Sequence, residues 1–379
     1  MSVLGGYQAE LERALDSLRA AGLLRRLRPA AGIDLVSNDY LGLAEHPQLA
    51  EAMARALAEL PAGSGGSRLL RGQHAAFDAI EERLAEFSGS EAALLFGSGY
   101  AANLGLLQSL AGPDDVVLSD ARNHASLIDG SRLSGARKAI YPHNDVAAVV
   151  AALALPRRGR AFVVTESVFS MDGDFAPLAE LLAAAEARGA LLVVDEAHAT
   201  GLYGARGSGR VEALGLRDRV LATVHTGGKA LGSGGAWVAG PSVLRELLIN
   251  RARTLLFSTA PLPVLTAALG AGLDLVAREP ERRAEVHRKA ALLRAALAAE
   301  GVRAGGDSAI VPLVVGANEA AIMLQDALQG AGFDVRAVRP PTVPEGTARL
   351  RVTVRAPVAD QDLARFAGEV GRLLKARAA

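Results

Sequence analysis

One lysine, Lys229, stands among small residues after an apolar run and is the leading candidate for amine chemistry in the chain. Of the 41 lysines and arginines, only Lys138, Lys229, Lys289 and Lys375 are lysines. Lys289 and Lys375 fall on charged helical patterns and Lys138 precedes a strand, so we expect these three to be solvated. The small neighbours of Lys229 offer few polar groups to stabilise its charge. Partial burial lowers the pKa of an amine, and imine formation requires an amine with a lowered pKa. The pattern favours a Schiff-base lysine over the alternative, a surface lysine on a flexible loop.

A glycine-rich turn, Gly97-Ser98-Gly99-Tyr100, follows the apolar run 92–96 and precedes a helical segment. Glycine lets the backbone approach a ligand closely, and a helix N-terminus offers unpaired N–H groups with a favourable dipole, which suits a phosphate. The turn also satisfies a relaxed dinucleotide fingerprint, with Asp120 about 20 residues further on. A phosphate site, an NAD site and a tight turn without a ligand all stay open at this point.

The segment Asp195-Glu196-Ala197-His198 ends another apolar run and admits four interpretations. The plainest is a solvated strand end. A metal site is disfavoured, because there is no HExxH motif and the seven histidines are scattered. A nucleotide-hydrolase box needs a phosphate loop, but around the only Gly-Lys pair, 228–229, Thr223 stands in place of its first glycine and Ala230 in place of its hydroxyl residue. In the fourth interpretation, a carboxylate supports the ring nitrogen of a cofactor.

Pyridoxal phosphate is the cofactor that uses a phosphate cradle, an acid for a ring nitrogen and an amine together. The sequence therefore predicts a pyridoxal-phosphate enzyme with Lys229 as its imine-forming residue. The absence of a GxSxG serine elbow removes the commonest α/β-hydrolase interpretation. An NAD-dependent oxidoreductase is the competing hypothesis, and it leaves Lys229 and the segment 195–198 without a role.

Alternating apolar and helix-like segments predict the α/β architecture that would bring these residues together. Several of the apolar runs lack polar alternation, as strands buried on both faces of a parallel sheet do. The predicted strands are 92–96, 116–118, 139–141, 161–165, 190–194, 220–224 and 236–239, with helices at 104–110, 146–155 and 177–188. Ligands in such sheets lie beyond the carboxyl ends of the strands, where the candidate residues stand.

The chain divides by pattern into three parts. We predict an N-terminal helical segment (1–45), a large α/β domain (46–275) and a small C-terminal α+β domain (276–379). The last part has predicted helices at 281–300, 320–331 and 361–377 and strands at 310–314 and 350–354.

Bulk composition excludes several classes of function. The formal net charge is +0, so nothing favours nucleic acid or an acidic membrane surface as a partner. The chain has no cysteine, which excludes disulfides and thiolate chemistry and favours a cytoplasmic location. Residues 1–30 have the pattern of an amphipathic helix, not of a signal peptide. The uncharged stretch 258–273 is broken by two prolines, so no membrane span is expected there.

Several stretches, in the same order along nearly the whole chain, resemble the α-oxoamine synthases, which are fold-type I pyridoxal-phosphate enzymes. They are SNDYLG at 37–42, GSGGSR at 63–68, NHAS at 123–126, VFSMDGD at 168–174, DEAH at 195–198, TGGK at 226–229 and RPPTVP at 339–344. The resemblance implies an aspartate-aminotransferase-like fold, with a mainly parallel sheet between helices and a smaller C-terminal domain.

The resemblance also implies roles for the cofactor-binding residues. Lys229 would form the imine and move the substrate's α-proton, while Asp195 would pair with the protonated ring nitrogen. His198 would hydrogen-bond the ring's phenolic oxygen, and His124 would stack on the ring; from the residues alone, His124 is more readily interpreted as a capping or core histidine. The implied phosphate ligands are the backbone of Gly99 and Tyr100, the side chains of Ser170 and Thr226, and Thr259 from a neighbouring subunit, since the family builds its sites at a dimer interface.

The implied substrate residues are cations and their neighbours. Asn38 and Arg351 would hold the amino acid's carboxylate, where a planar guanidinium gives two-point fixation. Arg25, Arg339 and Thr342 match positions near the acyl chain. Without the motif context, each arginine would be taken as a solvated surface residue.

The reaction that the resemblance implies is the decarboxylative condensation of an amino acid with an acyl thioester. The stretches at 339–344 and 63–68 favour the branch that joins L-alanine to a pimeloyl thioester in biotin biosynthesis. The alternatives are the branches that use glycine with a short acyl-CoA, 5-aminolevulinate synthase and 2-amino-3-ketobutyrate ligase. The sequence leaves open whether the acyl carrier is coenzyme A or an acyl carrier protein.

Overall fold

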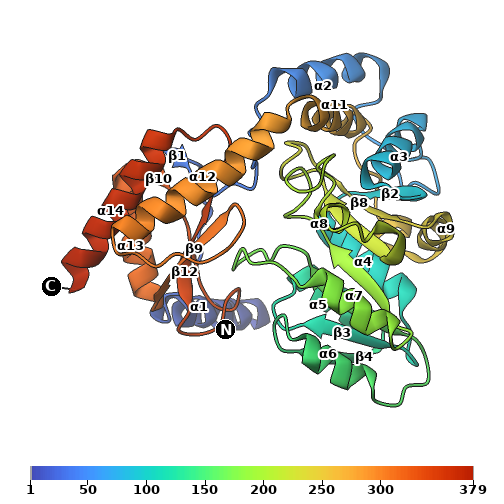
Figure 1. The fold of residues 1–379 in the computed structure, drawn as a ribbon, viewed down its shortest axis with the longest axis horizontal. Helices are drawn as coiled ribbons and strands as arrows, with labels where there is room; N and C mark the ends of the chain where they lie inside the picture. The colour runs from blue at the N-terminus through green and yellow to red at the C-terminus, as the bar shows by residue number, and fades with distance from the viewer. Residues whose placement is uncertain (1, 379) are drawn as a thin grey trace.

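The computed structural model describes residues 2–378, and a seven-stranded sheet dominates it (Figure 1). The strands lie in the order β2-β8-β7-β6-β5-β3-β4, and β8 alone runs against the others. Their bounds are β2 Ala92–Phe96, β3 Val116–Asp120, β4 Arg137–Tyr141, β5 Ala161–Glu166, β6 Leu191–Asp195, β7 Ala222–Thr226 and β8 Ala236–Gly240. The predicted mainly parallel α/β fold is confirmed.

Each of the seven predicted strands is present, and all but the edge strand β4 are short apolar runs that the sheet largely buries. The largest shift concerns the predicted strand 220–224, which lies at Ala222–Thr226. A single 3-10 turn, Arg217–Arg219, precedes it, and pairing starts where Ala222 meets Val193 of β6. Hydropathy marks Val220 as strand-like but does not report where the neighbouring strand begins.

Helices cover both faces of this sheet. On one face, α4 (Gly99–Leu110), α9 (Ser242–Arg251) and α10 (Arg253–Leu256) share an apolar core with Val117, Val164 and Val193, and α5 (Ala125–Leu133) adds to it. On the other face, α6 (Val146–Leu153) and α7 (Leu178–Glu186) pack against Val163 and Val194. Beside them lie α2 (Pro47–Glu59), α3 (Ala75–Ser88) and α11 (Leu265–Arg278), with the short α8 (Arg210–Ala213) nearby.

The C-terminal part forms a separate lobe in the view of Figure 1. Its antiparallel sheet has the order β11-β12-β9, and α12, α13 and α14 pack around the core of this lobe. The bounds are β9 Ile310–Gly316, β11 Ala337–Val338, β12 Ala348–Thr353, α12 Pro280–Ala299, α13 Asn318–Gly330 and α14 Asp360–Ala378. The N-terminal segment joins this lobe, since β1 (Ile33–Asp34) pairs in parallel with β10 (Phe333–Asp334).

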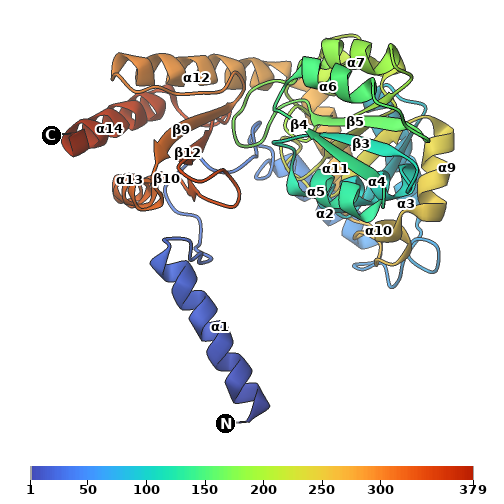
Figure 2. The same ribbon diagram turned by 90° about the horizontal axis from the view of Figure 1, so that it is seen from below.

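Helix α1 (Val3–Ala20) stands clear of both lobes, as Figure 2 shows. None of its residues is buried, and Leu4, Tyr7, Leu11, Leu15 and Leu18 are all exposed at helical spacing along it. The amphipathic helix expected in residues 1–30 therefore exists, with its apolar stripe uncovered in the single chain. Over residues 2–378, no helix combines the length and apolar character that crossing a bilayer requires.

Candidate active site

The carboxyl ends of β5, β6 and β7 lie side by side and bring the candidate residues to one edge of the sheet. In the strand register, Glu166 is opposite Asp195, and Asp195 is opposite Val224. The turn after β7 then carries Lys229. The predicted convergence at the strand ends follows from this parallel pairing.

Lys229, His198 and Tyr40 are linked in this order by hydrogen bonds between their side chains. The Nζ of Lys229 lies 2.9 Å from Nε2 of His198, and Nδ1 of His198 lies 2.6 Å from the hydroxyl of Tyr40. Burial, with the nearby Lys229 charge, holds the pKa of His198 well below its usual value, so the imidazole is neutral. Burial also lowers the pKa of Lys229 from 10.5 to about 8, against the opposing charges of Asp195 and Glu166. The amine is thus easier to deprotonate than a solvated lysine.

Asp195 is buried and held in one orientation. Its Oδ2 accepts a hydrogen bond from Nδ2 of Asn103 (2.7 Å), and its Oδ1 accepts one from the backbone N–H of Ala197 (2.8 Å). Asn103 also donates to the hydroxyl of Ser126 (2.9 Å). A carboxylate fixed this way can face a cationic ring nitrogen without rearranging.

His124 caps the start of α5, and its backbone N–H donates to Oε1 of Glu166 (2.6 Å). Its Nδ1 lies 2.7 Å from the hydroxyl of Ser126, which fixes the ring. Burial lowers the pKa of His124, and Asp195 and Lys229 also act on it with opposite signs. The ring therefore lies within electrostatic range of both groups, as a residue stacked on a cofactor between them requires.

The glycine turn before α4 fits a phosphate. Ser98 caps the helix by accepting from the N–H of Ala101 (3.2 Å), and its carbonyl accepts from Ala102. The N–H groups of Gly99 and Tyr100 have no acceptor among residues 2–378. A Cβ added at Gly97 or Gly99 would meet no atom of the chain, so the space in front of this backbone is open to a ligand.

Arg351 on β12 reaches from the small lobe into this site. It is buried, and it donates through Nε to the carbonyl of Ser170, through Nη1 to Thr353 (2.8 Å) and through Nη2 to Oδ1 of Asn38 (3.0 Å). A guanidinium has five N–H donors, so about two of them stay free, one on each Nη atom. Two free donors on neighbouring nitrogens are what two-point binding of a carboxylate would require, and the role predicted for Asn38 and Arg351 stays a prediction.

The other predicted residues lie elsewhere. Arg25 and Arg339 are neighbours, because Arg25 donates to the carbonyl of Pro340 (3.0 Å) and Arg339 donates to that of Gly22. Thr342 follows in the same exposed turn. No hydrogen bond or ion pair in the described chain joins these three to Lys229 or Asp195. Thr259 is exposed, and among residues 2–378 no hydrogen bond joins it to another predicted site residue.

One expectation about the lysines was wrong. Lys289 is buried, and its Nζ donates to the carbonyl of Ala356 at 2.5 Å. The charged pattern of α12 suggested solvent on all sides, but the loop before α14 covers this position. Lys138 is exposed, and Lys375 pairs with Glu300 at the surface (3.0 Å), as expected.

Three residues of the site were missed from the sequence. Glu166 accepts from the backbone of His124 and of Ser170, and burial with the neighbouring Asp195 charge raises its pKa to about 8. Asn103 and Tyr40 orient Asp195 and His198. Glu166 had a local signal, since it directly follows a predicted strand, and Tyr40 lies in the SNDYLG stretch that carries the resemblance.

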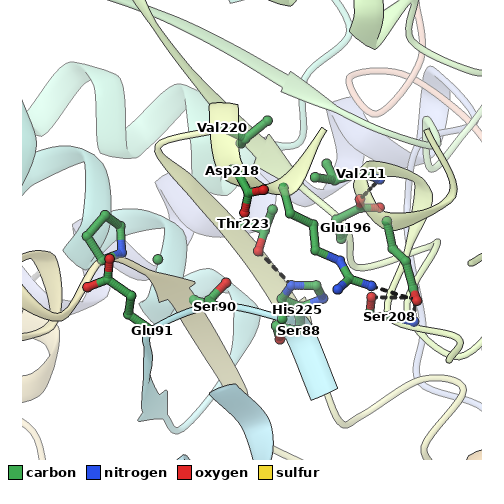
Figure 3. A pocket seen from close by; sticks show the side chains of 16 residues that line it. Ser88, Ser90, Glu91, Glu196, Ser208, Val211, Asp218, Val220, Thr223 and His225 are labelled. Carbon is green, nitrogen blue, oxygen red and sulfur yellow. Dashed lines mark hydrogen bonds and ion pairs between the residues drawn. The ribbon is translucent and has the colours of Figure 1, made fainter. Parts of the chain in front are cut away.

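The side chains of the DEAH segment lie in two different places. Asp195 and His198 lie in the candidate site with Lys229, whereas Glu196 lines a separate cavity of about 240 Å³ with Thr223 and His225 (Figure 3). The polar groups there are already paired: Glu196 accepts from Val211 N–H (2.6 Å), and His225 contacts Thr223 (2.7 Å). Burial lowers the pKa of His225 to about 3, so this ring is neutral. None of the predicted site residues lines this cavity.

Asp120, the acid that an NAD site would need, is buried and occupied. It accepts from the backbone of Arg122 (2.8 Å) and Asn144 (2.9 Å) and lies 2.9 Å from Nδ1 of His143. Both carboxylate oxygens of Asp120 are therefore already engaged, which weakens the oxidoreductase hypothesis.

Comparison with known families decides the relationship. A family model described as aminotransferase class I and II matches residues 30–370. The chain belongs to this family. Within the aminotransferase class I and II family it is an α-oxoamine synthase, because its relatives are of that group. The 8-amino-7-oxononanoate synthase of Geobacter sulfurreducens is 46% identical over 379 residues, covering 95% of this chain and 97% of that protein. The synthase of Anaeromyxobacter dehalogenans is 48% identical over 356 residues, covering 90% and 89%.

Solved structures of family members share the fold. Serine palmitoyltransferase from S. paucimobilis, described with a bound aldimine of pyridoxal phosphate and myriocin, is 30% identical with a TM-score of 0.91, covering 99% of each chain. The 8-amino-7-oxononanoate synthase of Francisella tularensis is 26% identical with a TM-score of 0.81, covering 92% of this chain and 99% of that one.

Proposed function

We propose that this chain is a pyridoxal-phosphate-dependent acyltransferase that condenses L-alanine with a pimeloyl thioester, releasing CO2 and the thiol, to give 8-amino-7-oxononanoate for biotin biosynthesis. The observation that carries the proposal is the placement of one partly buried amine, Lys229, 2.9 Å from a neutral histidine and within electrostatic reach of the fixed Asp195. Relatives 46% and 48% identical, all along the chain, support the choice of reaction.

The chain's own residues supply binding and proton transfer. When bound, the cofactor supplies an electron sink for the charge that develops on the amino acid's α-carbon. Lys229 would hold the cofactor and, once released, carry the α-proton, since its lowered pKa suits an amine that both takes and returns a proton near neutral pH. Asp195 would keep the ring nitrogen protonated, and His198 would face the ring's phenolic oxygen.

Substrate orientation would come from the small lobe. The two free N–H groups of Arg351, with Asn38 beside them, would hold the alanine carboxylate. The N–H groups of Gly99 and Tyr100, with the hydroxyl of Thr226, would hold the cofactor phosphate. Because Arg351 also donates to the carbonyl of Ser170, the two lobes are joined beside the place where cofactor and amino acid would meet.

We also propose that two copies of the chain associate, with Thr259 facing the partner's phosphate site. Phe257 is 72% exposed and Leu70 is 83% exposed, so two large apolar side chains face outward on this surface. The segments that carry them adjoin, because Ala260 N–H donates to the carbonyl of Gly66 (2.9 Å). A second subunit would cover this surface and the apolar stripe of α1.

A panel of amino acids and acyl thioesters, followed by thiol release, tests the reaction. We expect L-alanine with a pimeloyl thioester to have the highest kcat/KM. Glycine with a short acyl-CoA as the preferred pair would replace the proposed reaction with that of a related synthase.

A further inference from the structure

Alternate residues at the C-terminal end of β12 contact the segment 34–44, which carries two residues of the candidate site. Arg351 donates to Oδ1 of Asn38 (3.0 Å), and the hydroxyl of Thr353 donates to a backbone carbonyl of this segment (3.3 Å). Arg355 follows at the same spacing, two residues beyond the strand. Side chains alternate along a strand, and the residues between these three are buried in the core of the small lobe. The row that ends with Arg355 therefore faces away from that core.

Arg355 lies between two carboxylates of this segment. Its Nη1 donates to Oδ2 of Asp34 (2.8 Å), and its Nη2 donates to Oδ2 of Asp39 (2.8 Å). Its Nε donates to the backbone carbonyl of Asp39 (2.9 Å). The Arg355 side chain is only 14% exposed, so solvent screens these contacts less than it screens an ion pair at an open surface. The planar guanidinium thus fixes the distance between the two acids.

Asp34 fixes the first turn of the segment. Its Oδ1 accepts hydrogen bonds from the backbone N–H groups of Val36 (2.9 Å) and Ser37 (2.8 Å). Burial would raise the pKa of Asp34, but these hydrogen bonds and the charge of Arg355 lower it overall. Asp34 is therefore ionised at neutral pH, as its pairing with Arg355 requires.

Asp39 fixes the second turn. Its Oδ1 accepts from the backbone N–H of Leu43 (2.8 Å), and its Oδ2 accepts from that of Ala44 (3.3 Å). Asn38 lies between the two turns. The backbone on both sides of Asn38 is therefore attached to carboxylates that Arg355 joins.

The chain after Arg355 packs closely against the same segment. The backbone N–H of Ala356 donates to the carbonyl of Tyr40 (2.8 Å). Gly42 has a φ of 70°, and a Cβ added there would overlap the ring of Pro357. Because the hydroxyl of Tyr40 lies 2.6 Å from His198, this packing also bears on the residue that would face the cofactor.

We propose that Arg355 is a positioning residue for the amino-acid substrate, which holds Asn38 beside Arg351 by joining Asp34 to Asp39. The inference rests on the proposed function, in which Asn38 and Arg351 bind the substrate's carboxylate. Since Oδ1 of Asn38 accepts from Arg351, its Nδ2 is the group left to donate to that carboxylate. Among residues 2–378, the side-chain hydrogen bonds of Arg355 go to Asp34 and Asp39 alone, so it acts through Asn38.

Titration of the holoenzyme with L-alanine and with 2-aminopropane tests the role. Both amines change the absorbance of the bound cofactor when they bind, and 2-aminopropane has the same amine and methyl group but no carboxylate. In Arg355→Met we expect the Kd of alanine to rise about tenfold, which is the value of one hydrogen bond to a charged group. The Kd of 2-aminopropane should change by less than about twofold, because nothing in it contacts Asn38.

Two further variants separate positioning from general stability. Arg355→Lys keeps the charge but reaches one carboxylate at a time, so its Kd for alanine should lie between those of the wild type and Arg355→Met. Arg288→Met is the matched control. Arg288 also joins two carboxylates of the small lobe, Glu285 (2.8 Å) and Asp360 (2.7 Å), but it makes no contact with the segment 34–44. This control should leave both Kd values unchanged.

The outcomes distinguish this role from the proposed function. An unchanged Kd for alanine in Arg355→Met, or an equal rise for both amines, overturns the positioning role. The titration uses no acyl thioester, and any amino acid that binds can replace alanine, so a different preferred substrate in the thiol-release panel leaves the comparison intact. If the wild type binds no amino acid, the proposed function fails. Hydrogen exchange then decides: the backbone amides of Val36, Ser37, Leu43 and Ala44 should exchange faster in Arg355→Met, and equal exchange overturns the proposal.

Discussion

Replacing His143 with glutamine should remove a charged bridge that holds part of the active site. Nδ1 of His143 lies 2.9 Å from Asp120 and Nε2 lies 2.7 Å from Asp174, so both ring nitrogens need a proton. The ring also packs edge-on against Phe169, 4.4 Å between centroids, in the segment that carries Ser170. A neutral imidazole would turn a lone pair toward one carboxylate.

The size of the effect follows from the pKa of His143. Burial alone would lower this pKa, but the hydrogen bonds to Asp120 and Asp174 outweigh it and raise the pKa from 6.5 to about 9. A shift of this size corresponds to about 3 kcal/mol of unfolding free energy, because each pKa unit is worth about 1.4 kcal/mol. Since the folded-state pKa is the higher one, this stabilisation is fully present below pH 6.5 and is lost as pH rises through about 9.

Chemical unfolding of the wild type and His143→Gln at about pH 6 and about pH 10 measures the effect. We expect the difference in unfolding free energy between the two proteins to shrink by about 3 kcal/mol between these values. His287→Gln is the matched histidine control, because His287 contacts the uncharged carbonyl of Leu202 (2.9 Å) and no pair of carboxylates. An equal difference at both pH values for His143→Gln would mean that the bridge is not charged.

Three further changes test the site. Lys229→Ala should abolish the absorbance band of the lysine–cofactor imine, which borohydride removes from the wild type; an unchanged band would refute the assignment. Arg351→Lys should raise the KM for alanine by roughly 10- to 100-fold with a smaller change in kcat, because an ammonium cannot bind a carboxylate at two points. An unchanged KM in steady-state kinetics would contradict the role of Arg351 in binding the carboxylate. Asn103→Leu should lower kcat about tenfold by removing the 2.7 Å hydrogen bond to Asp195, and wild-type kcat with a wild-type melting temperature would count against a positioning role for Asn103.

The sequence by itself determined the strands and the main chemical candidates. The inner strands such as β2 and β5 are short apolar runs, and the apolar character of such a run is a local property that hydropathy records. Lys229 could be singled out because lysines are few and its neighbours are small. Since parallel strands end at one edge, the residues after those runs, such as Asp195, could be expected to meet.

Only the tertiary structure decided which polar residues are buried and paired. Glu166 belongs to the site because β5 and β6 pair in a register that sets it opposite Asp195, and a register cannot be read from one strand. Lys289 is buried because a distant loop covers it. Arg25 meets Pro340 across 315 residues of chain, a contact that no local pattern records. Hydropathy and spacing describe a segment and its near neighbours, whereas charge pairing and desolvation depend on what the fold brings against it.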